Sequence, residues 1–162
     1  MTVETYRGVL ERRFGGVLLR GQHTEDGQAC ALEVASVVRG VVWTDDPRTV
    51  GLPDLRALND AAWSTDAMRT EHMVPVIEAL WDWSAWTDER RRRVVARVAE
   101  RTIREILPIV LRQAGLNDEA NRCAEEGTAD AADAAYAAAR AADDDLLITS
   151  CRIWIESAAE AV

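Results

Sequence analysis

The sequence predicts an all-α fold, a single irregular bundle of about six helices. No segment of the 162 residues shows the sustained alternation of apolar and polar residues that is typical of a half-buried strand. Several segments instead repeat apolar residues every three or four positions, which is the spacing of one helix face. The chain also contains 27 alanines, 17 of them after Ala96, and alanine is the best helix former.

Charge is distributed unevenly along the chain. All 19 basic residues are arginine, and the 28 acidic residues leave a net charge of −9. Residues 1–115 carry 16 arginines and 17 acids, whereas residues 116–162 carry 3 arginines and 11 acids. We therefore predict one domain, 1–162, with a near-neutral core (1–115) and an acidic, alanine-rich helical segment (116–162).

Composition excludes several classes of protein. An apolar fraction of 48 % supplies a core and argues against disorder. A strongly acidic chain is a poor sequence-independent binder of nucleic acid or of an anionic membrane surface, so we expect neither as a partner. No apolar run approaches the about 18 residues of a membrane span. The N-terminus lacks the basic stretch and apolar run of a secretory signal, so we expect a cytoplasmic protein.

The cysteines indicate neither a disulfide framework nor a zinc site. Cys30, Cys123 and Cys151 are odd in number and widely spaced. The sequence contains no Cys-x-x-Cys or His-x-x-x-His pair, the spacings that structural zinc sites use. We therefore expect no metal and no cofactor.

The first half of the chain predicts three short helices. The first covers residues 2–14 and ends at a pair of glycines. The second runs from about residue 28 to 39, with Asp26 as its N-cap and Gly40 as its stop, because its apolar residues form one helical stripe. The third covers residues 55–63.

The middle of the chain predicts two longer helices that each contain a proline. One begins at residues 64–66, and Pro75 inside it predicts a kink or a break. The other is the clearest of the chain: Thr87 caps it, apolar residues recur at three and four, and Gly115 closes it. Pro108 predicts a bend near its end.

The acidic segment predicts a long helix and a final one. Residues 118–142 are rich in alanine, and Gly127 and Thr128 are the points where this helix would break. A final helix begins at residues 143–145. Four consecutive arginines, residues 90–93, stand in the first turn of the preceding long helix, where cations oppose the helix dipole. This mild conflict predicts acidic partners for them, in the acidic segment.

A motif runs through the first half: a Gly-x-His turn, Cys-x-x-Glu opening a helix, Gly-x-x-Trp-Thr-Asp-x-Pro, and Asn-Asp. It is carried by Gly21, His23, Gly27, Cys30, Glu33, Gly40, Trp43, Thr44, Asp45, Pro47, Pro53, Asn59 and Asp60. The pattern resembles a family of uncharacterised, alanine-rich proteins from actinobacteria and their phages. The resemblance implies a shared domain over about residues 15–80 and such a source, and it implies no activity.

The candidate catalytic residues are Cys30, His23 and Glu33. A thiol in the first turn of a helix has its pKa lowered by the backbone N–H groups and the dipole. His23, on the preceding turn, would serve as a base, with Glu33 or Asp45 as the orienting carboxylate. The alternative is structural: Cys30 begins an apolar stripe, Glu33 accepts hydrogen bonds from loop N–H groups, and His23 closes the turn.

The candidate interaction residues are Trp43, Asp45, Trp81, Trp83 and Trp86. Trp81, Trp83 and Trp86 cannot share one helix face, because positions two apart diverge by roughly 200°. At least one therefore lies at the surface or at an interface, where tryptophan is enriched, unless the three form a hydrophobic hinge. The segment around Trp43 and Asp45 reads as a structured loop or, alternatively, as a ligand-facing lip with paired carboxylates.

Three functions are compatible with these patterns. The first is a small helical module that binds a protein partner or a second copy of itself. The second is a cysteine-dependent enzyme that uses Cys30 with His23 and a carboxylate. The third is a nucleic-acid mimic, in which the acids of residues 116–162 imitate phosphates toward a basic protein. We favour the first, because the sequence contains no complete catalytic motif.

Overall fold

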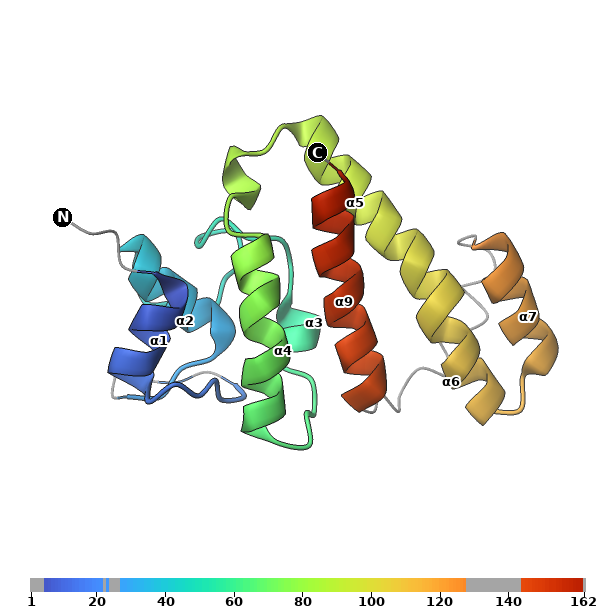
Figure 1. The fold of residues 1–162 in the computed structure, drawn as a ribbon, viewed down its shortest axis with the longest axis horizontal. Coiled ribbons are helices and arrows are strands. Elements are labelled where there is room, and N and C mark those ends of the chain that lie inside the picture. The colour runs from blue at the N-terminus through green and yellow to red at the C-terminus, as the bar shows by residue number, and fades with distance from the viewer. Residues whose placement is uncertain (1–4, 22, 24–26, 128–143, 162) are drawn as a thin grey trace. The chain divides into compact units, whose positions relative to one another are not determined.

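A computed structural model describes residues 5–21, 23, 27–127 and 144–161, and over these ranges the protein is all-α without a strand, as predicted (Figure 1). The chain divides into two compact units, Met1–Trp86 and Thr87–Val162. This boundary differs from the change of composition at residue 115. The reason is that the C-terminal helix of the acidic segment packs on the arginine-rich helix of the preceding region, within the second unit.

The two units have different sets of helices. The first unit contains α1 (Tyr6–Phe14), α2 (Ala31–Arg39), α3 (Arg56–Asn59), α4 (Asp66–Ala79) and a 3₁₀ turn (Trp83–Ala85). The second unit contains α5 (Asp88–Arg101), a π-helical turn (Thr102–Ile106), α6 (Leu107–Gln113), α7 (Asn117–Glu126) and α9 (Asp144–Glu160).

Threonine side chains begin three of these helices. At Thr5, Thr65 and Thr87 the hydroxyl accepts a hydrogen bond from the backbone N–H three residues later, over 3.1 or 3.2 Å. Each bond satisfies a donor that the first helical turn leaves without an intrahelical partner. Thr87 caps α5 as predicted, and α4 begins within the predicted residues 64–66.

Three helices of the first unit are shorter than predicted. α1 begins at Tyr6 and not at residue 2, because Thr5 is extended and caps the helix. α2 begins at Ala31 with Cys30 as its N-cap, because Ala29 is held in the preceding loop by a hydrogen bond from Leu19 N (2.9 Å). Asp26, the predicted cap, lies outside the described residues. α3 is a single turn, since the indole N–H of Trp63 donates to the Leu58 carbonyl (3.1 Å), which a longer helix would use internally.

The two internal prolines act differently. α4 continues through Pro75 without the predicted break. Pro108 has no N–H to donate to the Arg104 carbonyl, and its ring crowds that oxygen. The backbone widens into the π-helical turn just before Pro108, so the helix that starts at Asp88 continues to Gln113 with a change of helix type.

The acidic segment is helical at both of its described ends. α7 ends at Gly127, whose φ of 65° is left-handed, at the predicted break. α9 begins at Asp144, as predicted. Residues 128–143, which carry most of the predicted alanine-rich helix together with Thr128, lie outside the described residues.

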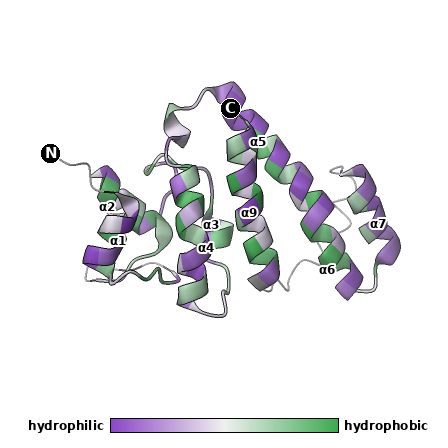
Figure 2. Ribbon diagram, viewed as in Figure 1, coloured by the Kyte–Doolittle hydropathy of each residue, from purple (hydrophilic) through white to green (hydrophobic). Residues whose placement is uncertain are grey.

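The second unit contains two small apolar clusters. One contains Leu111, Ala120 and Cys123, and the other contains Ile106, Val110, Leu146 and Ile153. On α5 only Val94 is buried, and Figure 2 shows hydrophilic residues over most of this helix. α5 therefore depends largely on polar contacts to hold its neighbours.

Candidate functional site

The carboxylate of Glu33 is the centre of the predicted cysteine cluster. Its side chain is only 2 % exposed. Oε1 accepts a hydrogen bond from His23 N (2.8 Å), while Oε2 accepts one from Cys30 N (2.7 Å) and lies 2.9 Å from His23 Nδ1. Glu33 is the third residue of α2, so it caps the helix and at the same time holds the incoming loop.

Cys30 is the N-cap of α2 and is completely buried. Burial, the largest cause, and the charge of the Glu33 carboxylate together raise the pKa of its thiol to about 12, although hydrogen bonds from the backbone and Asn59 act in the opposite direction. A thiol nucleophile reacts as the thiolate, with a lowered pKa. The three predicted residues do lie together. His23, however, contacts the Glu33 carboxylate, and the Cys30 thiol is protonated, which is the arrangement of the structural alternative.

The first N–H groups of α2 are engaged by protein atoms. Glu33 accepts from Cys30 N, and Asn59 Oδ1 accepts from Ala31 N over 3.0 Å. The amide of Asn59 in turn donates to Asp60 (2.8 Å). The Asn-Asp and Cys-x-x-Glu parts of the motif therefore meet. Together they occupy these backbone N–H groups, which are then not available to bind an anion.

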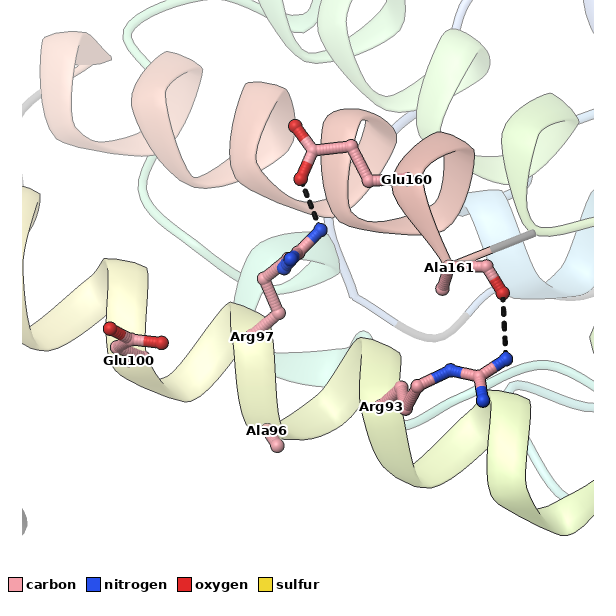
Figure 3. A pocket seen from close by; sticks show the side chains of 6 residues that line it. All are labelled: Arg93, Ala96, Arg97, Glu100, Glu160 and Ala161. Carbon is pink, nitrogen blue, oxygen red and sulfur yellow. Dashed lines mark hydrogen bonds and ion pairs between the residues drawn. The ribbon is translucent and has the colours of Figure 1, made fainter.

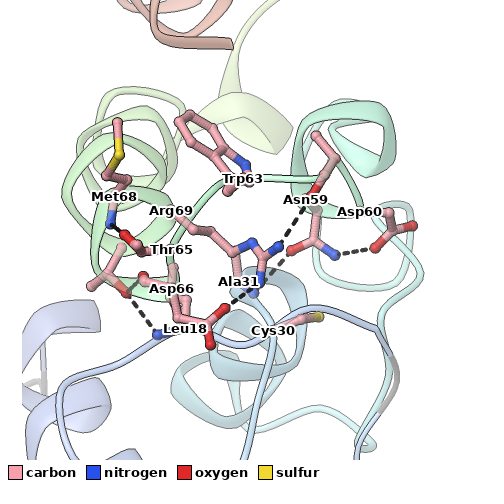
Figure 4. A network of polar contacts seen from close by, with 12 residues as sticks. Leu18, Cys30, Ala31, Asn59, Asp60, Trp63, Thr65, Asp66, Met68 and Arg69 are labelled. Carbon is pink, nitrogen blue, oxygen red and sulfur yellow. Dashed lines mark hydrogen bonds and ion pairs between the residues drawn. The ribbon is translucent and has the colours of Figure 1, made fainter. Parts of the chain in front are cut away.

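Arg69 is a buried residue that the sequence analysis missed. It is 2 % exposed, and its guanidinium contacts Asp66 Oδ1 (2.8 Å) and donates to the Ala61 carbonyl (3.1 Å) (Figure 4). Burial lowers its pKa, against the attraction of Asp66. The spacing of Asp66 and Arg69 on one helix was the available signal, but it does not distinguish a buried pair from a surface pair.

Trp43 and its neighbours form a structured loop. The Trp43 indole donates to the His23 carbonyl (2.8 Å), and its ring lies 6.0 Å from that of Phe14. The carboxylate that closes the loop is Asp46, whose pKa is lowered chiefly by the hydrogen bond from the Thr49 hydroxyl (2.7 Å). Asp45 is partly buried. Within the described ranges no three metal-ligating side chains gather in one place.

Trp81 lines a cavity of about 660 Å³ in the first unit. We define the Trp81 groove by its lining residues, which are Thr5, Tyr6, Val38, Arg39, Glu78, Trp81 and Asp82. The Arg39 guanidinium lies 4.2 Å above the Trp81 ring and donates to the Trp81 carbonyl, and the Tyr6 ring meets Trp81 edge-on at 6.0 Å. Arg7 pairs with Glu78 (3.1 Å) at the groove.

The other two predicted interface tryptophans lie elsewhere in the first unit. α4 ends at Ala79, so the three residues do not share one helix. Trp83 and Trp86 contact each other, with ring centroids 5.4 Å apart.

A second cavity, of about 270 Å³, lies between α5 and α9 (Figure 3). Arg90 and Arg93 donate to the carbonyls of Ala158 and Ala161, over 3.4 and 3.3 Å. Arg90 and Arg93, two of the four arginines, therefore face the carbonyl end of α9, where cations are favourable. In the described structure the carboxylate of Asp88 pairs with Arg91, and that of Glu89 pairs with Arg93. Both carboxylates lie on α5 itself and not in the acidic segment, where the sequence analysis placed them.

The acids proposed to imitate phosphates are described only in part. Asp143 and the side chain of Asp144 lie outside the described residues, whereas Asp145 is exposed.

Comparison of the chain with protein-family models, with curated protein sequences and with solved structures gives no match. The resemblance of residues 15–80 to the actinobacterial family therefore stays a prediction. Among the helices that the structure describes, none is long and apolar enough to cross a membrane.

Proposed function

We propose that the protein is a helical protein-interaction module that binds a segment of a partner protein in the Trp81 groove. The observation that carries this proposal is a partly exposed tryptophan at a cavity of about 660 Å³. Tryptophan that fills or lines a pocket is the residue type most enriched among interface hot spots.

The composition of the groove supports the proposal. Val38 and Trp81 supply partly exposed apolar surface beside the buried Tyr6 ring, and Glu78 and Asp82 supply an exposed charged rim. An apolar centre with a polar rim is the usual anatomy of a protein interface. Contacts from Tyr6 and Arg39 also fix the Trp81 ring before binding, which lowers the entropic cost of association.

The enzyme alternative has less support. Cys30 is buried, its thiol pKa is about 12, and the adjacent backbone donors are bound by Glu33 and Asn59. These features suit a helix cap better than a nucleophile.

A displayed library of random peptides tests the proposal directly. Peptides selected on the purified protein are titrated by calorimetry against Trp81→Ala and against Val38→Ser, which changes the groove with less risk to folding. We expect both variants to weaken binding at least about tenfold, since a hot-spot truncation costs about 2 kcal/mol.

Val95→Ser is the matched control, because Val95 is an apolar residue on α5 that is 49 % exposed and lies outside the groove. This variant should bind like the wild type. The proposal is wrong if no peptide binds more tightly than about 1 mM, or if Trp81→Ala and Val38→Ser bind the selected peptides as well as the wild type does. Circular dichroism of each variant confirms that it is folded.

A further inference from the structure

The ends of three helices meet at the Trp81 groove. Thr5 caps the start of α1, Val38 and Arg39 belong to the last turn of α2, and Trp81 and Asp82 follow the end of α4. Two of these three ends are C-terminal, and a helix C-terminus favours positive charge. The carboxylates of Glu78 and Asp82 act in the same direction.

The protein places its own guanidinium groups at this site. Arg39 lies against the Trp81 ring and donates to the Trp81 carbonyl, and Arg7 pairs with Glu78. An aromatic face, a carbonyl oxygen and nearby carboxylates are together a typical environment for a cationic side chain.

Arg39 is incompletely satisfied in this position. Its Nε is buried and has no hydrogen-bond partner among the described residues. No carboxylate pairs with it in the described part of the chain, and Asp82, at the same groove, is exposed and forms no ion pair there. A buried donor without an acceptor costs desolvation free energy. Moving Arg39 into solvent therefore recovers part of that free energy.

We propose that the Trp81 groove accepts an arginine or lysine side chain of the partner in exchange for Arg39. This inference rests on the proposed function, and it names the chemistry of the bound segment. The incoming cation stacks on Trp81 and pairs with Asp82, while Arg39 moves into solvent. Arg39 is then an internal competitor of the partner.

An anionic segment fits the groove less well. It would lie beside Glu78, Asp82 and the C-terminal ends of two helices, with Arg39 as its one favourable lining charge. The two possibilities predict opposite effects of removing Arg39. A cationic partner binds more tightly without its competitor, whereas an anionic partner loses the positive charge that lines the groove.

Three synthetic peptides provide the test. They share an uncharged sequence of alanine, leucine and serine and differ only at the central residue, which is arginine, norleucine or glutamate. Each is titrated by calorimetry against the wild type, Arg39→Gln, Asp82→Asn and Glu71→Gln. Glu71 is an exposed carboxylate of α4 that does not line the groove, so its variant is the control for charge alone.

We expect the arginine peptide to bind best. Arg39→Gln should raise its affinity about fivefold, and Asp82→Asn should lower it about threefold, within the range of exposed to partly desolvated cation contacts. Glu71→Gln should leave the affinity unchanged. Asp82 is exposed, so its variant tests the inference even if Arg39→Gln perturbs folding.

Other outcomes overturn the inference. A preference for the glutamate peptide, or weaker binding of the arginine peptide by a folded Arg39→Gln, would assign Arg39 to anion recognition. Equal binding of the arginine and norleucine peptides would remove the cation preference, but the Trp81 groove would stay a protein-binding site. If neither these peptides nor any library peptide binds, the proposed function falls together with the inference.

Discussion

Each of the two units has its own kind of internal polar contact. In the first unit the important polar side chains are Glu33, Asn59 and Arg69, which are each 2 % exposed or less. In the second unit arginine–glutamate pairs with partly exposed side chains join α9 to the region of α5 and the π-helical turn. Burial, more than the number of contacts, therefore sets how much each polar contact contributes to stability.

The pairs of the second unit form a regular ladder. The pairs are Arg97–Glu160, Arg101–Glu156 and Glu105–Arg152. From one pair to the next, the first residue lies four positions later in the sequence and its partner on α9 lies four positions earlier. This register is the one expected for antiparallel helices that meet once per turn. The ladder therefore specifies how α9 lies on its partner, although each exposed pair adds little stability.

The largest effect should come from Glu33→Ala. The variant leaves His23 N and Cys30 N without an acceptor in a buried place, so we expect the free energy of unfolding to fall by about 3 kcal/mol or more. Urea unfolding followed by tryptophan fluorescence measures it, because five of the six tryptophans belong to the first unit. Glu71→Ala is the exposed control and should cost less than about 0.5 kcal/mol. A loss below about 1 kcal/mol for Glu33→Ala would contradict the role given to this carboxylate.

Local signals explain which helices the sequence predicted well. Three predicted features depend on residues within one turn: the start of α4 within residues 64–66, the threonine cap of α5 and the glycine stop of α7. The start of α2 was predicted about three residues early. Its true position depends on hydrogen bonds to Leu19 and Asn59, and such distant partners leave no local pattern.

The same distinction applies to the candidate sites. His23, Cys30 and Glu33 lie within about one turn and one loop of each other, so their proximity was predictable. Their chemistry was not, because burial raised the thiol pKa that a helix terminus alone would lower. The Trp81 groove joins residues from three helix ends, and periodicity does not reveal which ends meet.

An intermediate effect should come from Cys30. If the residue is a cap, Cys30→Ala should cost about 1 kcal/mol, whereas Cys30→Ser, which keeps a capping atom, should stay within about 0.5 kcal/mol of the wild type. Urea unfolding of both variants measures the difference. Equal losses for the two variants would contradict a capping role.

The thiol pKa gives a second readout of the same residue. The folded pKa of about 12 exceeds the unfolded value of about 8.5, so the stabilisation is fully present below pH about 8.5 and is lost as pH rises toward 12. Cys151 behaves alike, because burial also raises its pKa to about 12. Native protein should therefore label slowly with a maleimide at pH 7.5, and fast labelling of Cys30 alone, located by mass spectrometry, would restore the nucleophile hypothesis.

The smallest effect should come from the ladder. Glu105 receives hydrogen bonds from Arg101 and Arg152, and the Arg101 bond is the main cause of its lowered pKa. The stabilisation is therefore present above the unfolded pKa of about 4.3 and is lost as pH falls through the lower folded value. We expect Glu105→Gln to cost at most about 1 kcal/mol at pH 7, because these side chains are partly exposed.

Acid and salt should both remove this difference between Glu105→Gln and the wild type. Urea unfolding followed by far-ultraviolet circular dichroism at pH 7, at pH 3 and in 1 M salt measures it, with Glu125→Gln, an exposed carboxylate of α7, as the control. A Glu105 effect that exceeds about 2 kcal/mol, or that persists at pH 3, would show that the ladder resembles the buried contacts of the first unit. The contrast between the two units would then lie in their geometry and not in the size of their polar contributions.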